Sequence, residues 1–438
     1  MTEKDLYSRH LDVVSDRFDR ALEAAGFDGA VVFSGSQHMI FLDDMPYPFK
    51  ANPHFKTWVP LTSEPDSFVL YERGGKPRVL FHQPVDFWHK PPETPAGQWV
   101  SEVDLEVVKT SEDAMKRLPR EGRWAWLGEP ADGLANGYEI NPEGLISWLD
   151  YDRAWKTEYE IDCMRKANEL AARGHLAARS AFESGASEWE IHLEYLRATS
   201  QNEAGLPYGN IIALNENAAV LHYQHQGRER PGKNRRSFLI DAGASWNGYA
   251  SDITRTWSAG DDEFQALVSS MNDAQKELVD EVRPGVDYKQ FHLSAHRKIG
   301  EILSKFEIVD MTVEEMVDQG VTGKFFPHGV GHYIGLQVHD VGGFKGDRKG
   351  REIPKPEGHP FLRLTRVLEP THVLTVEPGL YFIESLLQEL EGSEHGEKVN
   401  WKAVDRFKPF GGVRIEDDVV VRDGQCENLT RDAFAKIA

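Results

Sequence analysis

Five side chains that can bind a metal ion occur in the C-terminal half of the chain, each within or beside an apolar segment. They are, in chain order, Asp241, Asp252, His332, Glu377 and Glu416. Charged side chains are disfavoured in strands and buried turns, because an unpaired charge loses free energy when water is removed. The fold must therefore bring these segments together around a common partner. Four carboxylates and one imidazole suit two divalent cations that prefer oxygen ligands, and four negative charges would balance two dications.

The first two carboxylates lie in the segment SFLIDAGASWNGYASDITRTW (237–257), whose pattern favours a β-hairpin. The Asn-Gly pair in its middle is a strong signal for a two-residue turn. Given that turn, Asp241 lies opposite Thr254, and Asp252 lies on the same face as Asp241 because side chains alternate with a period of two. A solvated pair near a turn is the alternative, but the flanking apolar residues favour a functional pair.

Three histidines are interspersed with glycines in FFPHGVGHYIGLQVHD (325–340). His328 and His332 have the spacing of the zinc-binding HExxH motif, but Gly329 occupies the position of its glutamate, and the glycines disfavour a helix. The segment therefore lacks the signature of a single-zinc peptidase. A structural hydrogen-bonding role is the alternative for any one histidine. The grouping favours a site in which one histidine is a ligand and the others, including His339, lie beside the metal or face a substrate.

Two further segments with strand-like composition carry the glutamates. Glu377 ends the apolar run of HVLTVEPGLYF, and Glu416 lies in GGVRIEDDVVV with Arg414 on the same strand face. An arginine two residues away can hold a carboxylate in its ionised, ligating form. The alternative is a solvent-facing alternation, which is the arrangement we expect for Asp417 and Asp418.

The segment FLRLTRVLEP carries two arginines, Arg363 and Arg366, which we expect to share a strand face and to point in the same direction. A guanidinium that points into a cleft would suit a substrate carboxylate, because its parallel N–H donors match the two oxygens. A basic pair on the surface is the alternative.

Length and composition indicate a water-soluble protein of two domains. The chain has 438 residues, more than one core of typical size holds. Its net charge of −21 argues against binding to nucleic acid or anionic membranes. The N-terminus is densely charged, and no apolar run approaches the roughly 20 residues that span a bilayer. The two cysteines, Cys163 and Cys426, have no metal-type spacing, so a reduced, cytoplasmic protein is expected.

Residues 1–156 are predicted to form a small α/β domain, and residues 157–438 an α+β domain that holds all five candidate ligands. Helical periodicity and composition predict helices at 5–25, 157–182, 187–200, 262–282 and 287–305. Short apolar runs predict strands at 29–35, 67–71, 78–82 and 124–127. The polar stretch at 388–397 is predicted to be an exposed loop.

Together, the segments IDAG, SDITR, HGVGH, VHD, TVEPG and RIEDD resemble the signature of the pita-bread metallopeptidases, with all five ligand positions in matching order. The likeness extends to NENAAVLHY (215–223), PYGN (207–210), LRLTRVLEP (362–370) and FLDDMPYPFKANPHFKTWVP (41–60). These are similar to bacterial Xaa-Pro dipeptidases (prolidases), and most of all to the branch that includes organophosphorus acid anhydrolases. The resemblance covers essentially the whole chain. It implies a pita-bread catalytic domain preceded by a prolidase-like N-terminal domain.

The resemblance implies two divalent metal ions per subunit, with Mn2+ as the usual ion and Co2+ or Zn2+ as alternatives. Asp241 would bind one ion, and His332 with Glu377 would bind the other. Asp252 and Glu416 would bridge both ions.

The same resemblance implies roles around the metals. Arg363 matches the arginine that binds the C-terminal carboxylate of a dipeptide, and Arg414 matches the arginine beside the bridging glutamate. His222 and His339 match histidines that contact the scissile group. The other residues implied in the substrate pocket are His328, Tyr208, Leu221 and Val338.

A homodimer is also implied, in which Asp44 would reach the active site of the neighbouring subunit. His225 matches no role in the family and is expected to be structural or peripheral. The expected partners are small dipeptides, and neither nucleic acid nor membrane is expected.

The expected activity is hydrolysis of dipeptides with a C-terminal proline. A water molecule activated between the two ions would attack the carbonyl before proline, with Glu377 as proton acceptor and His339 beside the oxyanion. A tetrahedral phosphorus centre has the geometry of the resulting intermediate. Hydrolysis of P–F or P–O esters is therefore an expected side activity.

Two classes of alternative stay open. An aminopeptidase P would remove the residue before proline from longer peptides, but Arg363 argues for dipeptides. A peptide-binding module or a creatinase-like hydrolase on the same fold would be metal-free. Such proteins should have lost several ligands, whereas this chain retains all five.

Overall fold

The structure is a computed structural model that describes residues 3–131 and 133–437. The chain divides into two compact units. The first comprises Met1–Asp162 with Lys345–Arg351, and the second comprises Cys163–Phe344 with Glu352–Ala438. The short segment Lys345–Arg351 thus belongs to the first unit, although it lies far along the chain within the range of the second. No described helix has an apolar stretch long enough to cross a membrane.

A mixed six-stranded sheet of order β4-β3-β2-β1-β5-β6 forms the centre of the first unit. Its strands are β1 (Gly29–Phe33), β2 (Phe68–Glu72), β3 (Arg78–His82), β4 (Asp104–Val108), β5 (Trp124–Leu127) and β6 (Glu139–Ile140). Strand β1 pairs antiparallel with β2 and parallel with β5. All four predicted strands are confirmed. The two that were not predicted, β4 and β6, lie at the sheet edges, where charged residues replace the apolar run.

Helices α1 (Glu3–Ala25), α2 (Pro53–Trp58), α3 (Ser111–Arg117) and α4 (Glu143–Asp152) complete this unit. The buried positions of α1 include Tyr7, Leu11, Val14, Phe18 and Leu22, which recur every three or four residues. That spacing places them in one apolar stripe, so the helix is held to the unit by burial of one face.

The second unit contains the remaining helices and strands. Its helices are α5 (Glu158–Glu183), α6 (Glu188–Thr199), α7 (Asp262–Glu281), α8 (Tyr288–Lys305), α9 (Val313–Asp318), α10 (Thr322–Phe325), α11 (Glu384–Glu391), α12 (Trp401–Phe407) and α13 (Leu429–Ile437). The five predicted helices of the chain are confirmed, and their ends differ from the prediction by at most two residues. The stretch at 388–397 was wrongly predicted to be a loop throughout, because α11 continues to Glu391.

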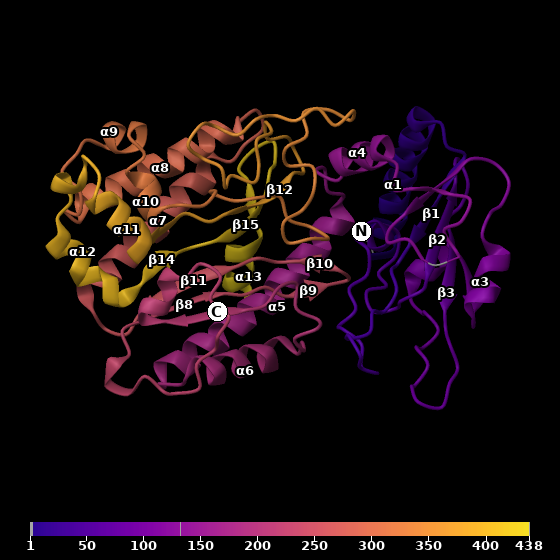
Figure 1. Cartoon of the computed structure of the whole chain (residues 1–438), viewed down its shortest axis with the longest axis horizontal. Coiled ribbons are helices and arrows are strands. Elements are labelled where there is room, and N and C mark those ends of the chain that lie inside the picture. The colour runs from indigo at the N-terminus through magenta and orange to yellow at the C-terminus, as the bar shows by residue number, and fades with distance from the viewer. Residues whose placement is uncertain (1–2, 132, 438) are drawn as a thin grey trace. The chain divides into compact units, whose positions relative to one another are not determined.

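Short strands lie between layers of helices in the second unit, as Figure 1 shows. They are β7 (Ile211–Leu214), β8 (Ser237–Asp241), β9 (Ser245–Trp246), β10 (Tyr249–Ala250), β11 (Thr254–Ser258), β12 (Val373–Val376), β13 (Gly379–Tyr381), β14 (Gly412–Arg414), β15 (Asp417–Val420) and β16 (Glu427–Asn428). On one side, Phe182 of α5 and Tyr195 of α6 pack with Ile212 of β7 and Phe238 of β8. On the other side, α7 contacts β11, β12 and β14.

The hairpin around the first two carboxylates has the predicted register. Asp241 pairs with Thr254 across β8 and β11, and Trp246 pairs with Tyr249 around the turn. The turn residues Asn247 and Gly248 have φ values of 50° and 85°, the left-handed values that a type I′ turn requires. This match explains why Asn-Gly occupies the turn.

The two arginines of FLRLTRVLEP do not share a strand face, which corrects the prediction. Their segment forms no strand, and its backbone places Arg363 at the surface while Arg366 is buried. Residues three apart point to opposite faces wherever side chains alternate with a period of two, so the spacing did not support a shared face. Only Arg363 remains available to a ligand on the surface.

Candidate metal centre

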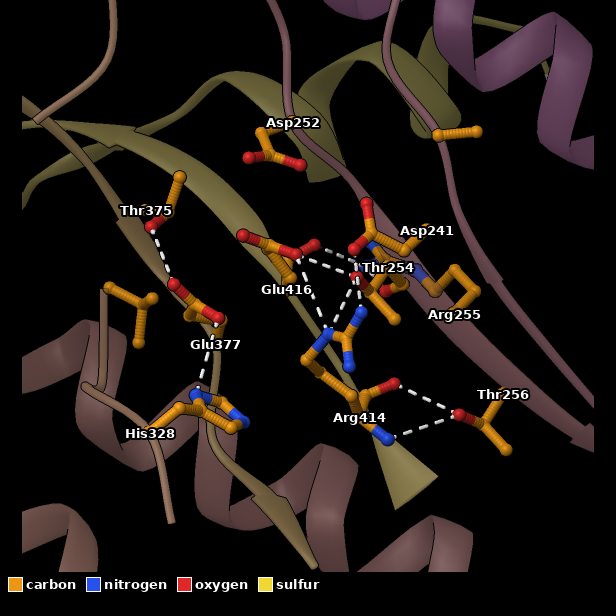
Figure 2. Close-up of polar contacts among 12 residues, drawn as sticks. Asp241, Asp252, Thr254, Arg255, Thr256, His328, Thr375, Glu377, Arg414 and Glu416 are labelled. Atoms are coloured by element: carbon orange, nitrogen blue, oxygen red, sulfur yellow. Dashed lines mark hydrogen bonds and ion pairs between the residues drawn. The ribbon is translucent and has the colours of Figure 1, made fainter. Parts of the chain in front are cut away.

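Strand ends and one glycine-rich loop place the five candidate ligands. Asp241 is the last residue of β8, and Glu377 directly follows β12. Glu416 follows β14 and forms an isolated β-bridge with Thr254. Asp252 lies between β10 and β11 of the hairpin. Figure 2 shows the four carboxylates around a common space, with Arg414 on one side of it.

The fifth ligand, His332, is brought close to β12 by a glycine. A Cβ atom on Gly331 would lie 2.0 Å from the carbonyl oxygen of Thr375, and its φ is 155°, so a side chain there would clash. This close approach lets the backbone N–H of His332 donate to Thr375 Oγ1 at 3.1 Å. The Nδ1 atom of His332 lies 2.9 Å from the carbonyl oxygen of Tyr333, which leaves Nε2 directed at the carboxylates.

Contacts between these side chains are short. One potential ligand atom from each of Asp252, His332 and Glu416 lies within 4.8 Å of the others. His332 Nε2 is 3.5 Å from Asp252 Oδ2 and 3.7 Å from Glu377 Oε1. The Tyr208 hydroxyl is 2.7 Å from Asp241 Oδ1 and 2.5 Å from Asp252 Oδ1. All five predicted ligands therefore surround one space.

A buried arginine balances part of the negative charge. Arg414 donates to Asp241 Oδ2 at 2.6 Å and to the Tyr381 hydroxyl at 2.8 Å. Its Nε atom lies 3.0 Å from Thr254 Oγ1, and that hydroxyl donates to Glu416 Oε2 at 2.6 Å. Arg414 thus holds two of the carboxylates in place, one directly and one through a threonine.

Burial and mutual repulsion give the centre unusual proton affinities in the absence of metal. Burial raises the pKa of Glu416 well above its usual range, the pKa of Glu377 to about 7 and the pKa of Asp241 to about 6. Burial also opposes charge on Asp252 and His332, but their mutual attraction outweighs it. The pKa of Asp252 is lowered, and the pKa of His332 is raised to about 9. A cation that binds here must displace protons.

We expect Mn2+ binding to the metal-free protein to release protons and to become tighter as pH rises from about 6 to about 9. The sign follows because the metal binds only carboxylates and neutral imidazole, and raising the pH removes the protons that compete. Calorimetric titrations in buffers of different ionisation enthalpy would measure the release. Asp423→Asn, which removes an exposed carboxylate, should release as many protons as the wild type. An affinity that does not change with pH would contradict the expectation.

The predicted substrate-side histidines lie beside the metal centre. His328 Nε2 is 2.8 Å from the Tyr381 hydroxyl, and its Nδ1 is 3.5 Å from Glu377 Oε2. The ring of His339 stands perpendicular to that of His332, with 4.4 Å between their centroids. Desolvation, and then the positive charges of His332 and Arg363, lower the pKa of His339 to about 3. His339 is therefore neutral at physiological pH.

The other predicted pocket residues differ in exposure. His222 is exposed. A protonated imidazole at this position lowers the pKa values of both His328 and His339, so His222 lies near them. Arg363 is exposed, and its positive charge also lowers the pKa of His339. Tyr208, Leu221 and Val338 are half-buried. His225 is exposed and contacts the ring of Tyr223. Asp44 is exposed in the first unit.

Two acidic residues next to Glu416 contradict the sequence prediction. Asp417 and Asp418 are fully buried, not exposed to solvent. Asp417 forms ion pairs of 2.7 Å with both Arg255 and Arg431. Asp418 accepts a hydrogen bond of 3.0 Å from the backbone N–H of Asp252. Their partners come from other segments of the chain, and they support the loop and strand that carry the candidate ligands.

Three further residues of the centre were not predicted from the sequence. Thr254 and Thr375 contact Glu416 and Glu377, and the Tyr381 hydroxyl lies between Arg414 and His328. The register of the hairpin already placed Thr254 opposite Asp241, so its position was available. Nothing in the sequence distinguished Tyr381 from an ordinary strand residue.

Comparison with known proteins identifies close relatives along the whole chain. Residues 162–423 match the model of metallopeptidase family M24, and residues 5–151 match the N-terminal domain of Xaa-Pro dipeptidase. An Xaa-Pro dipeptidase of Stenotrophomonas maltophilia (strain K279a) is 50% identical over 432 residues, covering 98% of this chain and 97% of the relative. An Xaa-Pro dipeptidase of Shewanella baltica (strain OS223) is 48% identical and covers 97% of each.

Solved structures share the fold at lower identity. Zn-substituted Escherichia coli aminopeptidase P in complex with product has a TM-score of 0.71 and 23% identity, covering 96% of this chain and 95% of that chain. Aminopeptidase PepP of Pseudomonas aeruginosa has a TM-score of 0.72 and 24% identity, covering 97% and 96%. The family model spans more than half of the chain, and the relatives above cover nearly all of it. The chain therefore belongs to metallopeptidase family M24.

Proposed function

We propose that this protein is an Xaa-Pro dipeptidase that uses two divalent metal ions to hydrolyse dipeptides with C-terminal proline. The observation that carries the proposal is the convergence of four carboxylates and one imidazole on one space. The Xaa-Pro dipeptidases of S. maltophilia and S. baltica, which are similar over nearly the full length of both chains, support the substrate class.

The residues of the centre fit the divalent ions that the family implies. Asp241 would hold one ion, His332 and Glu377 the other, and Asp252 and Glu416 would lie between them. The contact of one tyrosine hydroxyl with both aspartates supports this sharing. Because oxygen ligands outnumber the single nitrogen ligand, the set suits Mn2+, and Co2+ or Zn2+ would be alternatives.

When bound, the ions would supply a water molecule of lowered pKa and would polarise the scissile carbonyl. Glu377, whose carboxylate faces the same space as His332, would accept the proton of the nucleophile. His339 is neutral, so it can donate a hydrogen bond to the oxygen that becomes negative. His222 and His328 would orient the scissile group, and Leu221 and Val338 would line the pocket.

The bond before proline is a tertiary amide, which limits the contacts by which a site can recognise the substrate. The bond before proline has no N–H, so it offers no hydrogen there for recognition. A site that binds the chain ends instead does not need that hydrogen. Arg363 is exposed next to His339 and would pair with the C-terminal carboxylate. Such a contact would favour dipeptides over longer peptides.

The test of this function begins with protein stripped by a chelator and reloaded with Mn2+. Ala-Pro should be cleaved only by the reloaded protein, and Ala-Pro-Ala should be cleaved poorly or not at all. Efficient cleavage of the tripeptide would instead indicate an aminopeptidase P. Failure to cleave either peptide, with metal bound, would refute the peptidase proposal and leave a peptide-binding role.

In the same assay, Arg363→Met should raise KM for Ala-Pro by roughly 10- to 100-fold, the cost of losing a hydrogen bond to a charged group. Discrimination against Ala-Pro-Ala should fall as well, since the preference depends on the free carboxylate. The matched control is Arg283→Met, which removes an exposed arginine elsewhere and should leave KM unchanged. Equal effects of the two substitutions would indicate a general electrostatic contribution in place of a specific contact.

A secondary hydrolysis of P–F or P–O esters is also proposed. The support is chemical: a tetrahedral phosphorus centre matches the geometry of the peptide intermediate that the site would stabilise. Turnover of such esters should require the same ions and the same ligands as the cleavage of Ala-Pro.

We also propose that the protein is a homodimer in which Asp44 lies near the active site of the partner. The support is the exposure of apolar side chains next to Asp44. Phe41 is 85% exposed and Leu42 is 91% exposed, and large exposed apolar side chains grouped in this way are typical of interaction surfaces. A cytoplasmic location is proposed from the cysteine content, because a chain with two cysteines far apart in sequence is typical of a reducing compartment.

A further inference from the structure

Three histidines form a compact group in the second unit, separate from the carboxylate centre. His292 and His296 lie one turn apart on α8. His359 comes from the irregular segment 353–365. The Nε2 atom of His292 is 3.0 Å from Nδ1 of His359 and 3.2 Å from Nε2 of His296. One ring nitrogen of each histidine therefore faces the same point.

Ordinary hydrogen bonds do not satisfy this arrangement. His292 and His296 are buried, and Nδ1 of His292 is buried without a hydrogen-bond partner. If the proton of His292 is on Nε2, it can be shared with the two facing nitrogens, and Nδ1 is left as a buried lone pair. If the proton is on Nδ1, that buried N–H has no acceptor, and Nε2 can accept a hydrogen bond only when His359 Nδ1 or His296 Nε2 carries a proton. A cation at the common point would satisfy the facing lone pairs.

A neighbouring hydroxyl fixes the orientation of one ring. His296 Nδ1 lies 2.9 Å from Thr322 Oγ1, so it can donate its proton there and direct the lone pair of Nε2 at the other histidines. Metal-binding histidines commonly donate their second ring N–H in this way. Burial lowers the pKa of His296 to about 3 and lowers the pKa of His359, so both rings are neutral, as ligands must be.

The distances fit a metal ion of the first transition row. Two nitrogens bound to Zn2+ at about 2.0–2.1 Å in tetrahedral geometry are about 3.4 Å apart. The observed separations of 3.0 and 3.2 Å are close to that value, and all three ligand nitrogens lie within 4.8 Å of one another. Small rotations of the rings would complete the geometry.

The surroundings leave room for a further ligand and supply no carboxylate. The group lies in a pocket of about 230 Å3 that His328, Lys324 and Phe326 also line. None of the residues that line this pocket is acidic. A site of imidazole nitrogens and water favours Zn2+, Cu2+, Ni2+ or Co2+ over Mn2+, because nitrogen-rich sites follow the Irving–Williams order. The histidine site therefore prefers different metal ions from the carboxylate centre.

We propose that His292, His296 and His359 form an additional binding site for one transition-metal ion, Zn2+ above all, with water from the pocket as the remaining ligand. The ion would join α8 to the segment around His359, which already contacts both helix histidines through its ring. The inference does not depend on the proposed peptidase activity, because it concerns metal content alone.

The test compares metal content by mass spectrometry in untagged, chelator-stripped protein dialysed against Zn2+ or against Mn2+. Wild-type protein should retain one zinc ion per chain more than His359→Gln. Manganese content should be the same in both. The matched control is His89→Gln, whose side chain in the first unit is 80% exposed, and it should retain as much zinc as the wild type. Equal zinc content in wild type and His359→Gln would overturn the proposal.

A second readout covers the case in which the variant does not fold. Co2+ bound to three nitrogens and one water is four-coordinate, so it should give a strong visible absorption band in the wild type. Zn2+ should abolish that band stoichiometrically, and excess Mn2+ should not. His296→Gln should lack the band while retaining cobalt at the carboxylate centre. Absence of the band in folded wild-type protein, or its removal by Mn2+, would refute the site.

Discussion

Replacement of Asp252 by asparagine is expected to lower kcat/KM for Ala-Pro by roughly 1,000-fold or more. Asp252 is buried, and its two oxygens face different partners, Tyr208 on one side and His332 on the other. Asparagine keeps the shape but replaces one ligand oxygen with an NH2 group that carries no lone pair for a cation. The site would lose one negative charge and one shared ligand together. Steady-state kinetics with Mn2+-loaded protein would measure the loss.

The matched control for this change is Asp423→Asn, which removes an exposed carboxylate from the same unit and should leave kcat/KM unaltered. Thermal unfolding of the metal-free proteins would show that Asp252→Asn still folds. Asp252 and His332 attract each other in the metal-free protein, so the metal-free variant should fold but be less stable than the wild type. Retention of near wild-type activity by Asp252→Asn would show that Asp252 is not a ligand.

Replacement of Arg414 by methionine should destabilise the metal-free protein by about 3–5 kcal/mol, the usual cost of breaking a buried ion pair. Arg414 is 5% exposed, and its guanidinium contacts Asp241 and Tyr381. Without it, four buried carboxylates would face only His332 as a counter-charge. Urea unfolding followed by tryptophan fluorescence would measure the change, with Arg283→Met as the control for loss of an exposed arginine.

The destabilisation should depend on pH and on metal in a defined direction. Arg414 lowers the pKa of Asp241, Glu377 and Glu416, so its removal raises their pKa values further in the folded state. A raised folded-state pKa favours folding at low pH, when the carboxyl groups are protonated, and opposes it at high pH. The loss should therefore be larger at pH 8 than at pH 5. Saturating Mn2+ should enlarge it, because a variant that binds the ion more weakly gains less stability from it.

The substitution Arg414→Lys keeps the positive charge but not the planar guanidinium, so it separates the effect of charge from the effect of hydrogen-bonding geometry. Arg414→Lys should restore part of the stability, since an ammonium group also neutralises carboxylates. It should still weaken metal binding by roughly 10- to 100-fold, because it cannot reach Asp241, Tyr381 and Thr254 at once. Equal metal affinities of Arg414→Lys and the wild type would show that charge alone matters.

Local features of the structure were predictable wherever neighbouring residues determine them. Helices α5, α7 and α8 are long enough for their apolar periodicity to exceed chance, and their predicted ends differ by at most one residue. The Asn-Gly turn determined the register that pairs Asp241 with Thr254, because few other residue pairs adopt two successive left-handed conformations.

Features that depend on distant partners were not predictable. The pattern around Glu416 is compatible with exposure of Asp417, yet Arg255 and Arg431 make its burial favourable. In the 361–370 segment, Arg366 is buried and Arg363 lies at the surface, against the expectation that the two share a face. The histidine group on α8 also passed unnoticed, since its third member lies 63 residues beyond His296.

The sequence by itself determined the candidate residues of the proposed metal centre: which side chains offer ligand atoms, and in what order along the chain. This follows because an unpaired acid or imidazole in an apolar segment has a cost that only a partner removes. The tertiary structure alone decided which side chains support those residues, which acids are buried, and which three histidines form the separate group on α8. Those outcomes depend on contacts between separate segments, such as Asn168 with Asp418 and Arg414 with Asp241, and the free energy of each contact exists only once the chain has folded.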